Sequence, residues 1–351
     1  MPLAPRKGTG PLPDADAISN AAAGADRFAP LEAGHDAPSP DAIPIAGWKR
    51  IGKRVIQALM SDKLWTNCAC VGFFGFLSVF PILAIFVLLY GLAFDLDAVN
   101  AQIAVLEPLV PEMVFGLLAD RLTSLATNSN SDLTLGLLIS TGVALWTGSR
   151  GTNAMIDLLN LAYHEEASRS FVRRLMTAIA LTIGGLIGLI VVLLTVAAIP
   201  IVVGNIPFDR TAELIALYAR WPVLATLIFA GLTLLYRFAP NRRDARWRWL
   251  MPGAITGSVL WMALSVAFSI YVERFNDYGA MFGTLSVAVV MMLWVYYSAL
   301  VIAIGAILNA EIELQTRRDS TVGPPKPRGQ RGAVVADALP PPEAKQEPKE
   351  A

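Results

Sequence analysis

The sequence contains few charged residues, few histidines and few cysteines. Asp, Glu, Lys and Arg make up 16% of its 351 residues, against about 25% in soluble domains. Its 2 histidines, His35 and His164, are distant in sequence from its 2 cysteines, which excludes a zinc site of the usual Cys/His type. Cys68 and Cys70 would point to different sides of a helix, so we interpret them as small apolar packing residues rather than a disulfide.

Motifs of catalysis are missing as well. No ATP-binding motif or phosphate-cradling glycine loop is present, so any transport would be passive, coupled to an ion or driven by a partner. Metal-dependent cleavage of phosphodiesters needs clustered carboxylates or histidines, and the sequence offers little beyond the adjacent Glu165 and Glu166. We therefore predict that the protein is not an enzyme and that it holds no metal and no cofactor.

Apolar residues are abundant instead, at 55% of the chain, and they gather into six long runs. A membrane-spanning helix needs roughly 20 mostly apolar residues, and a backbone without water partners must be helical there. The runs cover residues 68–94, 133–148, 175–203, 221–238, 250–272 and 283–310. We predict an all-α, polytopic membrane protein whose six transmembrane helices lie within residues 47–318.

The segments outside the runs predict the orientation in the membrane. Residues 1–46 and 319–351 are rich in Pro and Ala, which predicts a disordered cytoplasmic tail at each end and no cleavable signal peptide. Lys and Arg flank the runs mainly on one side, which identifies that side as cytoplasmic. They are Lys49, Arg50, Lys53, Arg54, Lys63, Arg169, Arg173, Arg174, Arg237, Arg242, Arg243, Arg246 and Arg248. The opposite loops contain only Arg121, Arg210, Arg220 and Arg274.

Two segments beside the runs have helical patterns of their own. An apolar stripe beside a basic flank predicts an amphipathic, interfacial N-terminal helix that lies on the anionic inner leaflet. The stripe consists of Trp48, Ile51, Val55 and Leu59, and the flank of Lys49, Arg50, Lys53 and Arg54. Because the stripe favours lipid, membrane lipids rather than nucleic acid are the predicted partners. The long outer loop 95–132 predicts a small helical cap, either a structured connection or a gate over a cavity.

A stripe of polar residues that begins at the second run is the main functional signal. Its members are Arg150, Asn153, Asp157, Asn160 and His164, at steps of 3, 4, 3 and 4 residues along one helix face. Two interpretations stay open: the stripe faces water near the headgroups, or it lines a cavity open to the cytoplasm. In the second, the first four members form a substrate path, with Arg150 contacting an anion and Asp157 as its partner or a proton carrier. Because Arg150 and Asp157 lie roughly 10 Å apart along the axis, they would pair through Asn153 or a third group.

Pro81 interrupts the first run and removes a backbone donor, which predicts a kink near Ser78. We regard Ser78 and Pro81 as a candidate hinge, with static packing as the alternative. Glycine pairs at small-xxx-small spacing predict close contacts between helices. These pairs are Gly184 with Gly188 and Gly253 with Gly257.

Four stretches, taken in order, resemble the YihY/BrkB family of bacterial inner-membrane proteins. They are residues 73–81 (FFGFLSVFP), 144–163 (ALWTGSRGTNAMIDLLNLAY), 236–249 (YRFAPNRRDARWRW) and 293–313, which contains GAILNAE. The resemblance covers most of residues 48–313 and implies six spans with both termini inside. The family usually has an acid where this chain has Ile307, so no role for that carboxylate is implied here, whereas Asn309 and Glu311 remain.

Three classes of function compete. The family has carried a ribonuclease label for tRNA processing, and its other name reflects an association with virulence; the resemblance implies a role in lipid or solute transport. We predict a transporter-like protein of the bacterial inner membrane that moves a lipid or an anionic solute. The alternatives, in order, are a membrane-organising protein that maintains the envelope without transport, and a tRNA-processing ribonuclease. The sequence specifies neither the substrate nor the oligomeric state.

Overall fold

Long α-helices make up most of the structure. The computed structural model describes residues 34–93, 130–166, 171–205, 210–274 and 284–338. Its longer helices are α2 (Ile45–Leu59), α3 (Asp62–Ala93), α6 (Asn130–Ala162), α7 (Phe171–Asn205), α8 (Arg210–Phe238), α9 (Trp247–Arg274) and α11 (Thr284–Gln315). The short elements are the 3₁₀-helix η2 (Pro40–Ala42) and α12 (Val334–Asp337). The described residues form no strand beyond an isolated bridge between Ala245 and Thr321, which confirms the all-α class.

Each of the six apolar runs coincides with one long helix, from α3 to α11. Within the described residues, three helices contain windows that are long and apolar enough to cross a membrane: Trp221–Phe238, Trp247–Glu273 and Ala288–Gln315. Only 17%, 11% and 39% of these windows are buried inside the structure. So much apolar surface facing outward is typical of helices in contact with lipid. Six spans with both termini in the cytoplasm stay a prediction.

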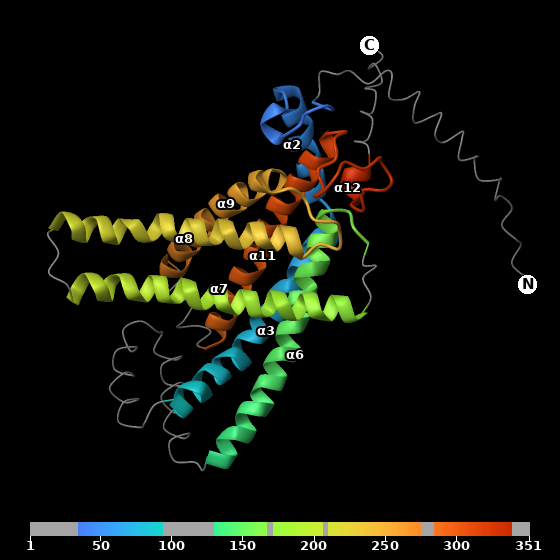
Figure 1. The fold of residues 1–351 in the computed structure, drawn as a ribbon. Helices are drawn as coiled ribbons and strands as arrows, with labels where there is room; N and C mark the ends of the chain where they lie inside the picture. Colours follow the sequence, from blue (N-terminus) through green and yellow to red (C-terminus); the bar gives the residue numbers. More distant parts are fainter. Residues whose placement is uncertain (1–33, 94–129, 167–170, 206–209, 275–283, 339–351) are drawn as a thin grey trace, which may run out of the picture.

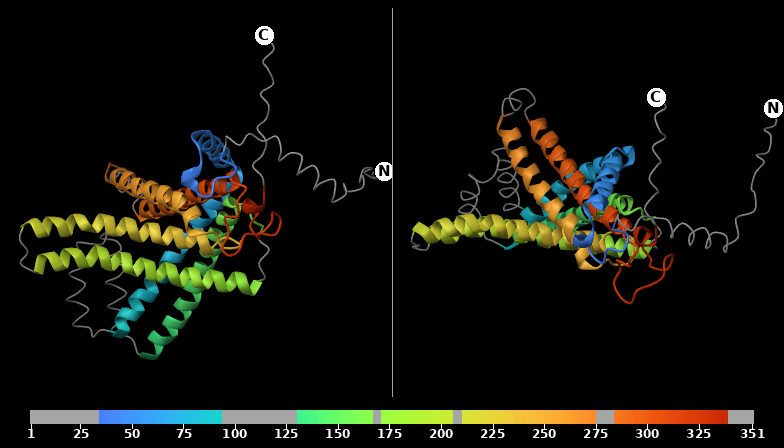
Figure 2. Two further views of the ribbon diagram at one scale, coloured as in Figure 1. Left: turned by 45° about the horizontal axis from the view of Figure 1, so that its top comes forward. Right: turned by 90° about the horizontal axis from the view of Figure 1, so that it is seen from above.

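The long helices form three antiparallel pairs that diverge from one end of the molecule (Figure 1). Helix α3 packs against α6, α7 against α8, and α9 against α11. Helix α11 also contacts α3, and α8 contacts α9, so the pairs are joined to each other. Figure 2 shows the same divergence from two further directions. The pairs meet at a junction that we call the hub. The hub consists of α2, loops 163–166 and 239–246, the last turns of α11 and residues 316–338.

Segments that the composition assigned to disordered tails are folded into the hub. Residues 319–332 pair with loop 239–246 through backbone hydrogen bonds: Arg246 N–H donates to Ser320 O at 2.9 Å, and Arg243 N–H donates to Gly332 O at 2.8 Å. The N-terminal segment joins through His35 O, which accepts from Arg317 N–H at 2.6 Å. The prediction of disorder was based on the low apolar content of these segments. In the described structure they are held by backbone hydrogen bonds instead, which composition does not reveal. Residues 1–33 and 339–351 lie outside the described residues.

Helix α2 forms where the amphipathic pattern predicts a helix, but its apolar stripe is used differently. Ile51 is fully buried and packs in a cluster with Trp249 and Ile312. Ile51 and Val55 of the stripe therefore pack against protein, because α11 extends to the hub and offers them an apolar surface. Trp48, at the start of the stripe, stays exposed, as do Ile45 and Ile56 on α2 and Met60 directly after it. Contact of this helix with the inner leaflet stays a prediction.

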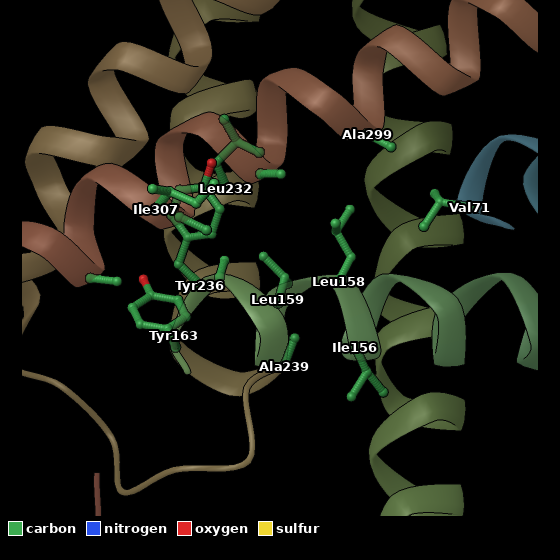
Figure 3. Close-up of a cluster of buried hydrophobic side chains, with 14 of the residues drawn as sticks. Val71, Ile156, Leu158, Leu159, Tyr163, Leu232, Tyr236, Ala239, Ala299 and Ile307 are labelled. Atoms are coloured by element: carbon green, nitrogen blue, oxygen red, sulfur yellow. The ribbon is translucent and has the colours of Figure 1, made fainter. Parts of the chain in front are cut away.

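The core lies where α6, α8 and α11 converge close to the hub (Figure 3). Tyr236 from α8 is 1% exposed, and its hydroxyl donates to Ile302 O at 2.8 Å. Ile307 belongs to the same cluster and is 3% exposed. The position where the resembling family has an acid is therefore filled by an apolar side chain that packs between helices.

Two predicted features lie mostly beyond what the structure describes. Helix α3 runs through Pro81, whose side chain is outside the described residues, and the Ser78 hydroxyl donates to Gly75 O at 2.7 Å. The hinge therefore stays a prediction. The outer cap is predicted in residues 95–132; residues 95–129 lie outside the described residues, and residues 130–132 begin α6.

Candidate functional site

Helix α7 supplies the partner for the polar stripe of α6. Arg174 Nη2 donates to both carboxylate oxygens of Asp157, at 2.9 and 2.7 Å. Its Nε donates to Asn153 Oδ1 at 2.8 Å, and Asn153 Nδ2 donates to Ser149 O at 2.7 Å. One guanidinium thus joins two stripe residues across the α6–α7 contact.

This ion pair is only half-buried. The Arg174 and Asp157 side chains are 34% and 41% exposed. Solvent-exposed ion pairs contribute about 0–1 kcal/mol to stability, so the fold does not depend strongly on this one. The arrangement suits a charged surface that can exchange partners with an incoming ion.

Arg150 does not take part in that pair. Its side chain is exposed, and its guanidinium carbon lies 5.7 Å from the centre of the Trp146 ring. The group that pairs with Asp157 is Arg174, which comes from a different helix. Arg150 is left accessible to an anion on the same helix face.

The last stripe residues belong to the hub rather than to a path. Asn160 is 5% exposed, and its Oδ1 accepts from Asn241 N–H at 2.7 Å. This bond fixes loop 239–246 against the end of α6. Of the four predicted path residues, the structure therefore brings Asn153 and Asp157 together, places Arg150 nearby on the surface and gives Asn160 a structural contact.

A fully buried ion pair lies in the hub. Arg242 Nη2 donates to both oxygens of Glu313, at 2.9 and 2.7 Å, and the two side chains are 1% and 0% exposed. The Ser320 hydroxyl adds a bond to Glu313 at 2.6 Å, and the Arg242 guanidinium lies 4.7 Å from the Tyr163 ring centre. Burial alone would lower the pKa of Arg242, but the Glu313 carboxylate outweighs it and raises that pKa.

A second charged cluster joins α2, α6 and α11. Arg54 pairs with the Glu311 carboxylate, and it also donates to Glu311 O at 2.9 Å and to Gln315 Oε1 at 3.0 Å. His164 Nε2 lies 3.6 Å from the other Glu311 oxygen. The interaction with the Glu311 carboxylate is the main cause that raises the pKa of His164, so the imidazole more readily carries a charge beside that carboxylate.

The backbone at His164 is constrained to make this contact. Its φ is 56°, the left-handed conformation that usually belongs to glycine at a helix end. Glu165 N–H donates to Asn160 O at 2.8 Å, which closes the last turn of α6. A non-glycine residue in this conformation costs on the order of 1 kcal/mol. The left-handed turn places the imidazole beside Glu311.

Sequence reasoning missed Arg54, Arg242 and Glu313 as site residues. Arg54 and Glu311 are 257 residues apart, and Arg242 and Glu313 are 71 apart, so no local spacing reveals the pairs. Glu311 and Glu313, at the end of the last apolar run, were the signal that could have revealed these pairs. Buried acids need cationic partners, so their position predicts arginines or lysines nearby. Among the described residues, no three His, Cys, Asp or Glu side chains lie close enough to hold a metal ion.

A family model described as Virulence factor BrkB matches residues 55–330. The chain belongs to the BrkB virulence factor family. This confirms the resemblance seen in the sequence. No solved structure matches the chain.

Relatives of the chain have membrane or ribonuclease-like names. A protein named ribonuclease-like protein YfkH, from Bacillus subtilis (strain 168), is 32% identical over 255 residues, which is 70% of this chain and 88% of YfkH. A UPF0761 membrane protein of Idiomarina loihiensis is 30% identical over 105 residues, 30% of this chain and 37% of that protein. One of Nitrosospira multiformis is 29% identical over 117 residues, 33% of this chain and 26% of that protein. The chain is therefore a member of a family of membrane proteins.

Proposed function

We propose that the protein moves an anionic lipid or an anionic solute across the bacterial inner membrane. The half-exposed group of Arg174, Asp157 and Asn153, with Arg150 accessible beside it, is the observation that carries the proposal. This charged surface lies at the hub end of α6 and α7, which continue as apolar helices away from it. An anion can exchange with Asp157 for the guanidinium of Arg174 and be received by Arg150. Both termini lie on the cytoplasmic side in this proposal.

The outward apolar surface supports a membrane location for this path. In the window Trp247–Glu273 only 11% of the residues are buried inside the structure. Ile183 and Ile187 on α7 are 50% and 57% exposed, so the helix that supplies Arg174 also presents apolar side chains to its surroundings. Lipid is the medium that makes such exposure favourable. Movement is passive, ion-coupled or driven by a partner.

A membrane-organising role without transport is the second candidate. The observation in its favour is that Arg174 already satisfies both carboxylate oxygens of Asp157. In this candidate the pair only fixes α7 against α6. A ribonuclease activity has the least support, since it rests on the name of one relative.

Two substitutions on the charged surface test the translocation proposal. Arg150→Ala and Asp157→Asn should each slow the movement of a fluorescent phosphatidylglycerol in proteoliposomes by roughly tenfold, because each removes one charge-assisted contact. Both variants should fold, since the exposed pair contributes only about 0–1 kcal/mol. Arg173→Ala is the matched control, because Arg173 is the exposed neighbour of Arg174 on α7.

If the native chain moves the lipid and both site variants move it at the same rate, the polar stripe is not part of the path. Loss of folding in both variants would show that the pair is structural. No movement of the lipid by the native chain would contradict unassisted translocation of this lipid and favour the organising role. If Arg173→Ala slows lipid movement as much as the site variants do, the loss of any cation on this surface has the same effect, and the site residues have no specific role.

A further inference from the structure

The hub contains a cleft of about 350 Å³ beside the start of α9. Five of the residues that line it are cations, and one is an acid. The cations are Arg246, Arg248, Arg318, Lys326 and Arg331, and the acid is Asp319. The cleft lies apart from the Arg174–Asp157 pair, which belongs to α6 and α7. Its positive charge is the feature that needs an explanation.

Two of the arginines form the walls of the cleft. Arg246 donates to Thr321 O at 3.0 Å and to Gly323 O at 3.2 Å. Arg331, 7% exposed, donates to Lys326 O, Ala336 O and Arg317 O at 3.1, 2.7 and 2.9 Å. Backbone carbonyls satisfy the donors of these guanidinium groups without neutralising their charge. Both charges therefore remain available to attract an anion.

The acid in the cleft forms hydrogen bonds within its own loop. The Asp319 carboxylate accepts bonds from Thr321 N–H and Lys326 N–H, both at 2.9 Å, and from the Thr321 hydroxyl at 2.7 Å. Burial would raise the pKa of Asp319, but these bonds outweigh it and lower that pKa. Asp319 thus stays ionised and holds the loop, and one negative charge cannot balance five cations.

The remaining cations are available to a ligand. Within the described part of the chain, the side chains of Arg248, Arg318 and Lys326 form no hydrogen bond and no ion pair. Two further acids belong to neighbouring segments. The pKa of Asp41 is lowered first by a hydrogen bond from Ser39 and more weakly by the charge of Arg248, and the Asp337 carboxylate accepts from Arg331 N–H at 3.2 Å. Three exposed cations beside two that are hydrogen-bonded to backbone carbonyls make a concave anion receptor.

We propose that this cleft binds a phosphate group, carried by a phospholipid headgroup or by a soluble compound. Arginine forks match phosphate oxygens in pairs, and lysine adds a point charge. No aromatic side chain is among the described residues that line the cleft, so none of these residues stacks a nucleobase. The cleft adjoins the first turn of the apolar window Trp247–Glu273, at the depth of headgroups on the predicted cytoplasmic side. The proposal does not depend on translocation.

The test uses the full chain in detergent and a double variant, Arg248→Gln with Arg318→Gln. Binding of radiolabelled orthophosphate is measured by equilibrium dialysis, and retention of phosphatidylglycerol or phosphatidylcholine by native mass spectrometry. The double variant should weaken anion binding at least about tenfold, because two charge-assisted contacts are lost. The matched control is Lys63→Gln with Arg173→Gln, which removes two exposed cations outside the cleft.

The outcomes separate the two sources of phosphate. Phosphatidylglycerol retained over phosphatidylcholine, and lost only in the double variant, supports a headgroup site. Orthophosphate bound without selective lipid retention, and lost only in the double variant, supports a site for a soluble phosphate compound. Equal binding by the native chain, the double variant and the control, or no binding of either probe, overturns the proposal. These measurements in detergent record binding and no movement across a bilayer, so failure of translocation and failure of this site are distinguishable.

Discussion

Replacing Gly253 with alanine should disrupt the packing of α9 against α11. A Cβ at Gly253 would collide with the Gly305 carbonyl and lie 2.5 Å from the Asn309 carboxamide. The Gly305 carbonyl is backbone and has no rotamer through which to move away. The Asn309 side chain accepts from Gly253 N–H at 2.7 Å and donates to Leu250 O at 3.0 Å, and both bonds would be lost. Overpacking and two unsatisfied buried groups together cost about 3–5 kcal/mol.

The thermal midpoint of the detergent-solubilised chain, followed by fluorescence-detected size exclusion, measures this loss. Gly184→Ala and Gly188→Ala are matched controls, because the same change in α7 meets no atom within 4 Å. Alanine is the better helix former by up to about 1 kcal/mol, so both controls should match or exceed the native midpoint. Equal midpoints for Gly253→Ala and the controls would show that α9 and α11 do not approach as described.

Removing the Glu313 carboxylate should destabilise the hub by a similar amount. Glu313→Gln leaves the Arg242 guanidinium, 1% exposed, without its counter-ion. It also weakens the bond from the Ser320 hydroxyl. Breaking one side of a buried ion pair costs about 3–5 kcal/mol, whereas replacing both partners with apolar residues is often neutral. We expect a lower thermal midpoint for Glu313→Gln and a marked recovery when Glu313→Leu is combined with Arg242→Met.

Asp157→Asn is the comparison for this prediction, since it also removes one carboxylate from an arginine pair, but at 41% exposure. Its effect on the midpoint should be about 0–1 kcal/mol. A loss in Asp157→Asn as large as that in Glu313→Gln would mean that burial does not separate the two pairs. A double apolar variant no more stable than Glu313→Gln would show that the hub needs the charges themselves.

The helices and the polar stripe could be predicted because both depend on patterns between residues that are close in sequence. The apolar runs predicted the helices from α3 to α11, and steps of three and four residues predicted that Asn153 and Asp157 share one helix face. The spacing could not identify Arg174 as their partner, because a helix face carries no information about the neighbouring helix. It also could not separate Asn160, which fixes a loop, from the others.

The glycine pairs show the same limit. Gly184 with Gly188 and Gly253 with Gly257 have identical spacing, yet only the second pair meets a neighbouring helix at close range. The hub was missed for a related reason. Its backbone pairing, such as Val322 N–H to Asp244 O at 2.9 Å, involves residues whose composition is typical of disordered tails. Hydrogen bonds between residues so far apart in sequence cannot be predicted from local patterns and are seen only in the folded structure.

Both the translocation path and the basic cleft require the hub to lie on the cytoplasmic side of the membrane. Labelling of single cysteines with a membrane-impermeant maleimide tests this most directly, in a chain with Cys68→Ala and Cys70→Ala. Val322→Cys places the label in the hub, where Val322 is 39% exposed, and Arg274→Cys places it at the far end of α9. Val322→Cys should react only in inverted vesicles and Arg274→Cys only in right-side-out vesicles. Reaction of both from the same side, or the reverse pattern, would contradict the proposed membrane arrangement.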